Sequence, residues 1–350
     1  MSGKTYTITF GDVAENHAKM QKIGSLHESG YSIEKLEEVQ SKLNGLGLTT
    51  EMIDLNVGFD DEFEKGKVLV IRRGGQFILG EEDFNGMMGE NDELCHDKMA
   101  LMRGKVVNKI ARHNLCFADD DQEPDYTDGK GRIVSWGRVR RISRIREVIS
   151  EWTDDVLLNG EANYYYDISK CGIGFHGDGE RKKVFAIRMG ETLPLYFQWF
   201  QQSSPVGPHF EIVLNDGDMY IMSEKAVGFD WLKKIKPTLR HATGCQKYTQ
   251  IVPKKVNKVE EVVVVKEIKE VKKRGGGKKD EKEKEKVRKM EEKMKKKEEK
   301  EKEKVRKMEE KEKEKVRKME EKEKEKVRKM EEKMKKKEDN KGKKVKGGKK

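Results

Sequence analysis

The sequence lacks the features that mark secreted, membrane-spanning and zinc-ribbon proteins. Its four cysteines are scattered and form no C-x-x-C pair: Cys95, Cys116, Cys171 and Cys245. This spacing argues against a disulfide framework and indicates a reducing compartment. The first residues have no apolar signal-peptide core, and no run approaches the roughly 20 apolar residues of a membrane span. We therefore expect a soluble intracellular protein, in cytoplasm or nucleus, with no membrane partner.

Apolar residues are scarce as well, at 34% of the 350 residues, and charge is unevenly distributed. Residues 254–350 contain 44 Lys and Arg against 26 Asp and Glu, a net charge of +18. The whole chain has 76 Lys and Arg and 65 Asp and Glu. Residues 1–253 therefore contain 32 basic and 39 acidic residues, a net charge of −7. The sequence therefore predicts an acidic folded part with a strongly basic tail. Nucleic acid, or another polyanion, is the partner expected for such a tail.

A low-complexity repeat fills most of this tail, residues 254–350. Val-Arg-Lys-Met recurs at four positions, starting at Val287, Val305, Val316 and Val327. An interval of eleven residues closes almost three helical turns, and Glu–Lys neighbours four residues apart favour a solvated helix. Two alternatives stay open beside that helix: a coiled coil through which the tail self-associates, and a disordered polyampholyte. The oligomeric state stays open with them.

The first 103 residues read as an N-terminal α+β extension. Ser32 is a candidate N-cap, and the apolar stripe of Leu36, Val39 and Leu43 predicts a helix that stops near Gly45. Two further segments have the apolar content and alternation of strands: Thr5–Phe10 and Val68–Ile71.

Residues 104–253 change to a pattern of short strands separated by turns, after one helix at Ser143–Trp152. The predicted strands are Ala162–Tyr166, Gly174–Phe175, Val184–Met189, Leu195–Trp199, Glu211–Leu214, Asp218–Met222 and Lys247–Val252. Many short strands with Gly, Pro and Asp between them predict a closed or double-sheeted β domain of the jelly-roll type. The fold class expected for the whole chain is therefore α+β, with a jelly-roll core.

The segment around His176 is the strongest candidate for a functional site. Residues at i and i+2 of an extended chain point the same way, so His176 and Asp178 can hold one metal ion from one strand. His241, several strands downstream, is the candidate third ligand. Two histidines and one carboxylate form the facial triad that holds non-haem Fe(II) and leaves other coordination positions open.

Several motifs around these ligands occur in the order of a known family. They are Asn163-Tyr164-Tyr165, His176-Gly177-Asp178-Gly179-Glu180, Gly217-Asp218-Met219-Tyr220, His241 and Lys247-Tyr248-Thr249-Gln250-Ile251. With them, residues from about 108 to 253 resemble the AlkB-like Fe(II)/2-oxoglutarate dioxygenases. The resemblance implies a double-stranded β-helix, with His176, Asp178 and His241 as the catalytic iron ligands.

The resemblance also implies a site for 2-oxoglutarate, which binds the iron beside O2. Lys247 is the expected cation for its far carboxylate, with Asn163, Tyr165 and Thr249 completing the co-substrate site. The family usually has two arginines on its closing strand, where this chain has Lys247 and, six residues on, Pro253. Three other cations are therefore alternatives to Lys247: Arg240, Lys254 and Lys255.

For the substrate, the resemblance places Glu180 where an acid accepts a hydrogen bond from a base. Residues 108–138 look like a nucleotide-recognition lid, with Arg112, Tyr126 and Trp136 as its binding residues. The implied activity is oxidative demethylation of alkylated bases in nucleic acid, as in DNA repair, by hydroxylation of an N-methyl group that then leaves as formaldehyde. The alternatives are a hydroxylase of a protein side chain or an unmodified base, and a non-catalytic nucleic-acid-binding protein.

Overall fold

Strands predominate in the described part of the chain, residues 3–59 and 63–251 of a computed structural model. The fold is mixed α and β. The chain divides into two compact units, Met1–Lys254 and Lys255–Lys350, and the second unit lies outside the described residues. The predicted helical or disordered tail, residues 254–350, therefore lies there too. None of the described helices combines the length and apolar content needed to cross a membrane.

The larger sheet has the strand order β4-β5-β15-β12-β1-β10-β8-β9. Its neighbours pair antiparallel except β8 and β9, which are parallel. The strands are β1 (Thr5–Gly11), β4 (Thr50–Asp54), β5 (Lys67–Ile71), β8 (His113–Ala118), β9 (Ile133–Ser135), β10 (Asn159–Tyr165), β12 (Val184–Gly190) and β15 (Met219–Met222). The N-terminal strand β1 thus lies in the interior of the sheet, between two strands that follow it by about 150 residues or more.

The smaller sheet is antiparallel, with the order β11-β16-β13-β14. Its strands are β11 (Gly172–His176), β13 (Leu195–Gln201), β14 (Ser204–Ile212) and β16 (Thr238–Gly244). Two hairpins complete the described strands: β2 (Val13–Glu15) with β3 (Lys22–Gly24), and β6 (Met99–Met102) with β7 (Lys105–Asn108).

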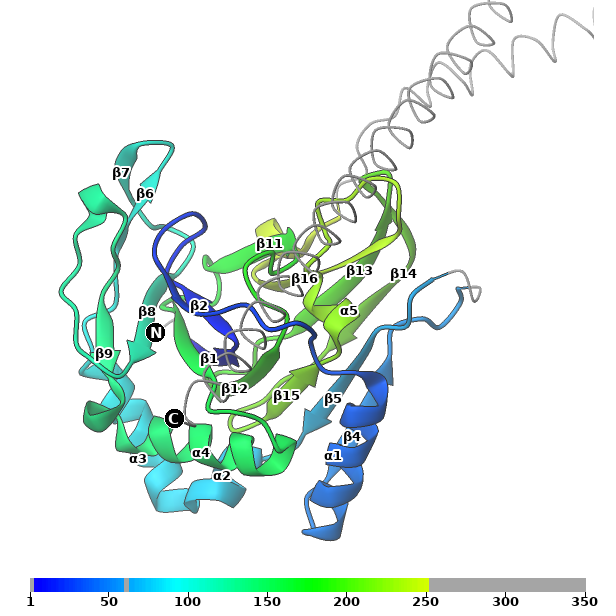
Figure 1. Cartoon of the computed structure of the whole chain (residues 1–350), viewed down its shortest axis with the longest axis horizontal. Helices are drawn as coiled ribbons and strands as arrows, with labels where there is room; N and C mark the ends of the chain where they lie inside the picture. Colours follow the sequence, from blue (N-terminus) through cyan, green and yellow to red (C-terminus); the bar gives the residue numbers. More distant parts are fainter. Residues whose placement is uncertain (1–2, 60–62, 252–350) are drawn as a thin grey trace, which may run out of the picture. The chain divides into compact units, whose positions relative to one another are not determined.

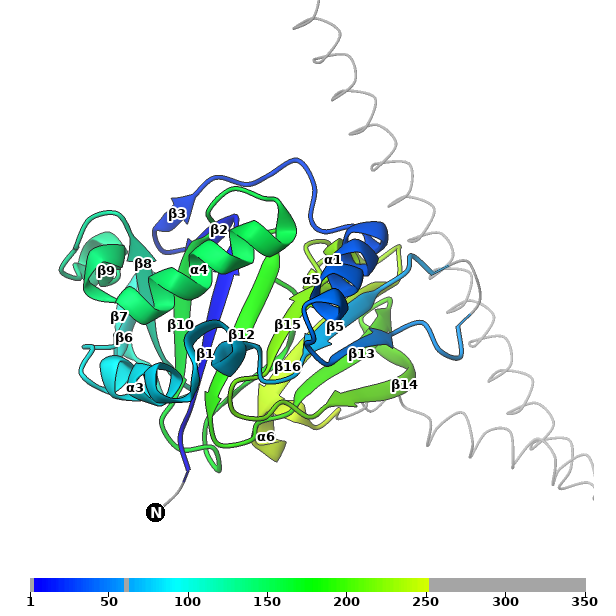
Figure 2. The ribbon, with the colours of Figure 1, turned by 90° about the horizontal axis from the view of Figure 1, so that it is seen from below.

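Four helices cover the face of the larger sheet that is turned away from the smaller one (Figures 1 and 2). They are α1 (Ile33–Gly45), α2 (Gly74–Leu79), α3 (Glu81–Asp92) and α4 (Arg140–Thr153). Two one-turn helices, α5 (Glu224–Val227) and α6 (Gln246–Thr249), and two 3-10 turns, η1 (Tyr126–Asp128) and η2 (Trp136–Arg138), lie elsewhere. The predicted start of α1 is confirmed, since the Ser32 hydroxyl accepts a hydrogen bond of 3.2 Å from the backbone N–H of Lys35.

Alternation along β1 explains its place between two layers. Tyr6, Ile8 and Phe10 belong to the core beneath the helices, with exposures of 1% or less. Thr7 and Thr9 point the other way, because successive side chains of a strand face opposite sides, and they line a cavity between the sheets. One strand therefore supplies apolar side chains to the core and hydroxyl groups to the cavity.

Most predicted strands are confirmed in position, but the domain boundary near residue 103 does not separate two units. β1, β4 and β5 pair in the same sheet as β10, β12 and β15, so residues 1–103 are part of the main fold rather than an extension. The strand predicted at Lys247–Val252 is also wrong, because Gln246–Thr249 form the short helix α6. The strand predicted at Glu211–Leu214 is the end of β14, which stops at Ile212.

If β1 is an interior strand, shortening Ile8 should lower the free energy of unfolding far more than shortening an exposed isoleucine does. Ile8 has an exposure of 0% and Ile110 of 69%. Ile8→Ala should lower the free energy of unfolding by about 2–5 kcal/mol, because it leaves a cavity in the core. Ile110→Ala should change it by about 0.5 kcal/mol or less. Urea unfolding followed by circular dichroism measures both, and equal effects would contradict the interior position of β1.

Candidate functional site

A cavity of about 640 Å³ lies between the two sheets. The three predicted metal ligands line it together with β1 and the β2–β3 hairpin. Of the other predicted site residues, Asn163, Tyr165, Glu180 and Arg112 also line the cavity. The structure therefore brings together residues from both ends of the described chain around one space.

The predicted ligands come from neighbouring strands of the smaller sheet. His176 ends β11 and lies opposite His241 of β16 in the strand register. Asp178 follows two residues later, where its backbone N–H donates a 3.0 Å hydrogen bond to the carbonyl of Val227. Gly177 permits this close approach, because a Cβ there would lie 2.1 Å from the carbonyl oxygen of Gly228.

The donor atoms of these three residues lie within 4.8 Å of one another. The Oδ1 atom of Asp178 is 3.5 Å from Nε2 of His176 and 3.4 Å from Nε2 of His241. Two donors bound at about 2.1 Å to one ion, at angles near 90–109°, are about 3.0–3.4 Å apart. The cluster is therefore slightly wider than a ligand set around an ion and needs a small contraction to hold one.

Hydrogen bonding prepares His176 for that role. Its Nδ1 atom lies 2.8 Å from the carbonyl oxygen of Gly174, so the ring proton belongs on Nδ1 and the Nε2 lone pair faces Asp178. Burial, and then the neighbouring His241, lower the pKa of His176 to about 3, so the ring is neutral at physiological pH. Nδ1 of His241 is buried without a hydrogen-bond partner among the described residues.

A buried arginine supports the carboxylate ligand. Arg181 donates to Glu161 at 2.5 Å and to Glu180 at 2.9 Å, and its Nε lies 3.5 Å from Oδ2 of Asp178. Burial alone would raise the pKa of Asp178, but His241 and then Arg181 outweigh it and keep the pKa below its usual value. Asp178 is therefore ionised, with one oxygen facing the two imidazoles.

Arg188 is a site residue that the sequence motifs did not single out. It lies on β12, has an exposure of 0% and lines the same cavity. One guanidinium nitrogen donates to the hydroxyl of Thr7, but Nε and Nη2 are buried without a partner among the described residues. An unpaired buried charge costs several kcal/mol, so this arrangement favours an anionic ligand in the cavity.

The surroundings of Arg188 complete a polar chamber. Tyr165, Tyr220 and Thr243 line the cavity with it, and Tyr165 and Tyr220 are at most 5% exposed. Burial raises the pKa of both tyrosines, so their hydroxyl groups are neutral hydrogen-bond donors at physiological pH. A carboxylate in this chamber would meet one guanidinium and several hydroxyl groups.

The cavity is lined in part by the segment that follows β1. Glu15, Asn16 and His17 line it, although their sequence alone indicated no chemistry. Burial, and then the charge of Glu180, raise the pKa of Glu15 to about 7. Glu15 and Glu180 therefore line the same cavity, and both can accept hydrogen bonds from a substrate.

Four predicted site residues lie outside the cavity. Lys247 is exposed on α6, with its Nζ 5.3 Å from the centre of the Tyr248 ring, and Thr249 ends the same helix. Tyr126 donates a 2.7 Å hydrogen bond to Asp97, and Trp136 is 8% exposed in the main core, against Phe117. The expected roles of Lys247 and Thr249 in co-substrate binding, and of Tyr126 and Trp136 in stacking, are therefore corrected.

Of the three alternatives to Lys247, the described residues include only Arg240. Arg240 lies on β16 but lines a different cavity, while Lys254 and Lys255 fall outside the described residues.

A sequence signal for Arg188 did exist. It is the single charged residue of β12, Val184–Gly190, whose other side chains are apolar. A lone arginine in such a strand needs a buried anionic or polar partner.

Divalent metal should bind to the cluster with a stoichiometry of one per chain. His241→Ala removes a direct metal ligand. It should therefore weaken metal binding by more than the roughly 10–100-fold that is lost when a residue hydrogen-bonded to a ligand is removed. His209→Ala is the matched control, since His209 is exposed on β14 and stacks on Tyr196 with ring centres 5.2 Å apart. Anaerobic equilibrium dialysis with Fe(II), or dialysis with Mn(II), gives both values. Unchanged affinity in His241→Ala would contradict the assignment.

Comparison with known proteins relates the chain to a viral protein. No protein-family model matches the chain. The chain is 46% identical over 251 residues to "Uncharacterized protein R156" of Acanthamoeba polyphaga mimivirus, a match that covers 71% of this chain and 98% of the viral protein. The chain belongs to the same family as this mimivirus protein.

Proposed function

We propose that the protein is an Fe(II)- and 2-oxoglutarate-dependent dioxygenase. The observation that carries the proposal is one cavity that holds both a two-histidine, one-carboxylate cluster and a buried arginine with unused donors. The first fits a metal with open positions, and the second fits the far carboxylate of a dicarboxylic co-substrate. A cluster of metal-ligating side chains, or a buried arginine, occurs in proteins of many functions, whereas one cavity that contains both favours this chemistry.

The strand order supports a double-stranded β-helix with an unusual connection. Along the chain from β10 to β16, the successive strands belong to the larger, smaller, larger, smaller, smaller, larger and smaller sheet. Continued winding would place the next strand in the larger sheet, between β10 and β12. In this chain β1 occupies that position. We therefore infer a β-helix whose closing strand is contributed by the N-terminus, so that no strand is needed after His241.

The chain's own residues divide the work of such a reaction. His176, Asp178 and His241 would hold Fe(II), and Arg188 with Thr7 and Tyr220 would fix 2-oxoglutarate. Bound Fe(II) with 2-oxoglutarate and O2 supplies an oxidant for C–H bonds, while 2-oxoglutarate becomes succinate and CO2. Arg181 would keep the Asp178 carboxylate oriented.

An alkylated nucleic-acid base is the substrate that we propose. Glu180 and Glu15 line the cavity and can accept hydrogen bonds from exocyclic amines, and Arg112 lines the same cavity. The net charge of +18 in residues 254–350 would add affinity that depends on salt and not on sequence. Hydroxylation of an N-methyl group inserts one oxygen atom from O2 into a C–H bond. The product then releases formaldehyde and leaves an N–H group.

Succinate formation tests this function directly. Full-length protein with Fe(II), 2-oxoglutarate and O2 should form succinate and, with N-methylated oligonucleotides, an equal amount of formaldehyde. Succinate with a hydroxylated product but without formaldehyde would select a hydroxylase instead. Absence of succinate with methylated and unmodified oligonucleotides and with peptides would contradict the proposal.

Arg188→Met should abolish turnover at ordinary 2-oxoglutarate concentrations. Removing the cationic partner of a buried carboxylate typically costs about 3–5 kcal/mol, which corresponds to a rise in the KM for 2-oxoglutarate of about two to almost four orders of magnitude. Lys247→Met is the matched control, because it removes a cation from α6 outside the cavity, and it should leave this KM unchanged. The opposite result would restore Lys247 as the anchor and refute the role of Arg188.

A further inference from the structure

A second cavity of about 520 Å³ opens beside the first. The two share Trp231 and Leu232, so one wall separates the proposed iron site from this neighbouring groove. Phe175, the residue directly before the ligand His176, lines the groove. A ligand that fills both spaces would therefore pass Trp231, which also lines the cavity of the proposed metal ligands.

Aromatic rings and a cation dominate the lining of this groove. Phe175, Phe200, Trp231 and Tyr248 contribute rings, and Arg240 contributes a guanidinium. That guanidinium lies 4.1 Å from the centre of the Phe200 ring and 5.4 Å from that of Trp231. Nε of Arg240 is buried with no hydrogen-bond partner among the described residues. Flat rings beside a cation with a free donor suit a ligand that is both planar and anionic.

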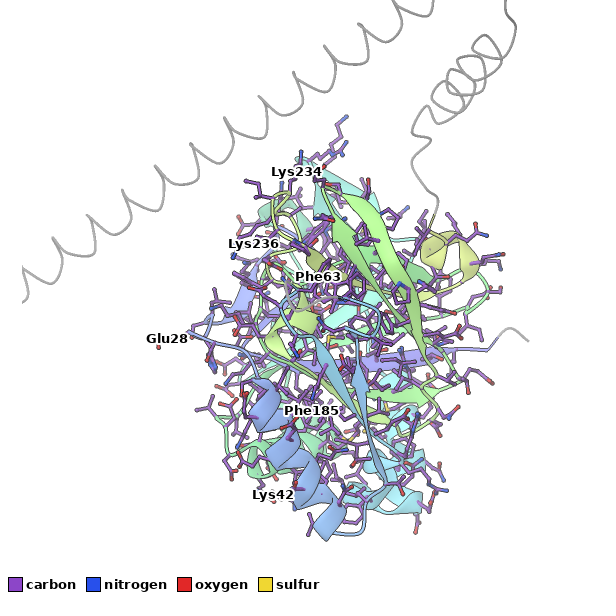
Figure 3. All side chains as sticks on the ribbon, turned by 90° about the vertical axis from the view of Figure 1, so that its right-hand side faces the viewer. Glu28, Lys42, Phe63, Phe185, Lys234 and Lys236 are labelled. Atoms are coloured by element: carbon purple, nitrogen blue, oxygen red, sulfur yellow. The ribbon has the colours of Figure 1, made fainter. Side chains whose placement is uncertain are left out.

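The rim of the groove is basic and apolar. In the segment 229–236, Phe-Asp-Trp-Leu-Lys-Lys-Ile-Lys, the single acidic residue is Asp230, which pairs with Lys225 at 2.9 Å. Lys234 lines the groove and reaches outward, with Lys236 nearby on the same side (Figure 3). Leu232 has an exposure of 72%, which is high for an apolar side chain. This rim attracts anions and offers apolar surface to bases.

We propose that the groove binds an unpaired nucleotide strand next to the base held in the iron cavity, so that the substrate is single-stranded nucleic acid. Bases stack on aromatic side chains only when their faces are free, as in a single strand, and cations beside the rings then contact phosphates. This inference rests on the proposed function, because it assigns the flanking part of that substrate. Binding in the groove needs neither iron nor 2-oxoglutarate, so the two can fail separately.

Charge argues against the protein's own tail as the occupant. Its basic repeats, residues 272–350, carry 39 Lys and Arg against 22 Asp and Glu, a net charge of +17, and would be repelled by Arg240 and Lys234. An acidic peptide with aromatic side chains shares the required charge and planarity. It is the rival that the experiment must separate from an oligonucleotide.

Tryptophan fluorescence reports on the groove apart from the tail. All four tryptophans lie in the described residues; Trp136, Trp152 and Trp199 are at most 8% exposed, and Trp231 is half-buried in the groove wall. Full-length protein should lose fluorescence on titration with a short oligothymidylate. A DNA hairpin of equal charge and a polyglutamate peptide containing tyrosine should cause no comparable quenching. In Trp231→Phe the quenching by oligothymidylate should disappear.

Two pairs of variants test the lining and the rim. Tyr248→Leu should weaken the quenching titration about fivefold or more, the lower end of the value of one base–aromatic stack, whereas Phe77→Leu, exposed on α2, should not. Lys234→Gln should weaken it about twofold and reduce its salt dependence, whereas Lys105→Gln, exposed on β7, should not.

The outcomes separate the alternatives. Quenching by oligothymidylate alone, lost in Trp231→Phe and weakened in Tyr248→Leu, supports the groove even if the protein forms no succinate. Equal quenching by the hairpin, quenching by the peptide instead, or no quenching despite oligonucleotide binding overturns the groove. If succinate and formaldehyde still form in that case, the proposed function stands without it.

Discussion

The pairing of β1 between β10 and β12 is the constraint on which the site depends. Thr7 lies opposite Asn163 on one neighbour and Arg188 on the other. The chain then turns at Asp12, whose buried carboxylate accepts hydrogen bonds from the backbone N–H groups of His27, Lys182 and Lys183. One strand thereby joins β10 to β12 in the larger sheet, holds Arg188 through Thr7, and leads to Glu15 and His17 in the cavity lining.

Two buried arginines differ in how far their charge is paired within the protein, and this difference separates a structural role from a ligand-binding role. Arg181 has three carboxylates around it, from Glu161, Glu180 and Asp178, so its charge is fully used within the protein. Arg188 has one hydroxyl partner and lines the cavity, and its Nε and Nη2 atoms have no partner among the described residues. A buried ion is stable only when it is paired, so Arg181 fits a structural role and Arg188 fits a role that a ligand completes.

The sequence could reveal the ligand cluster but not the rest of the site. His176 and Asp178 are close along the chain, and the order of motifs points to His241, so local spacing was enough. The partner of Arg188 could not be read in this way, because Thr7 and Arg188 are 181 residues apart and meet only through strand pairing. The error at Lys247 has the same origin: Gln246–Thr249 form the helix α6, and the position between β10 and β12 belongs to β1.

A structure of the protein with Mn(II) and 2-oxoglutarate, determined without O2 and with anomalous data for the metal, tests the central claim most directly. We expect one metal peak between His176, Asp178 and His241, with the far carboxylate of 2-oxoglutarate on the guanidinium of Arg188. A metal bound elsewhere, or a co-substrate that leaves Arg188 without a partner, would contradict it.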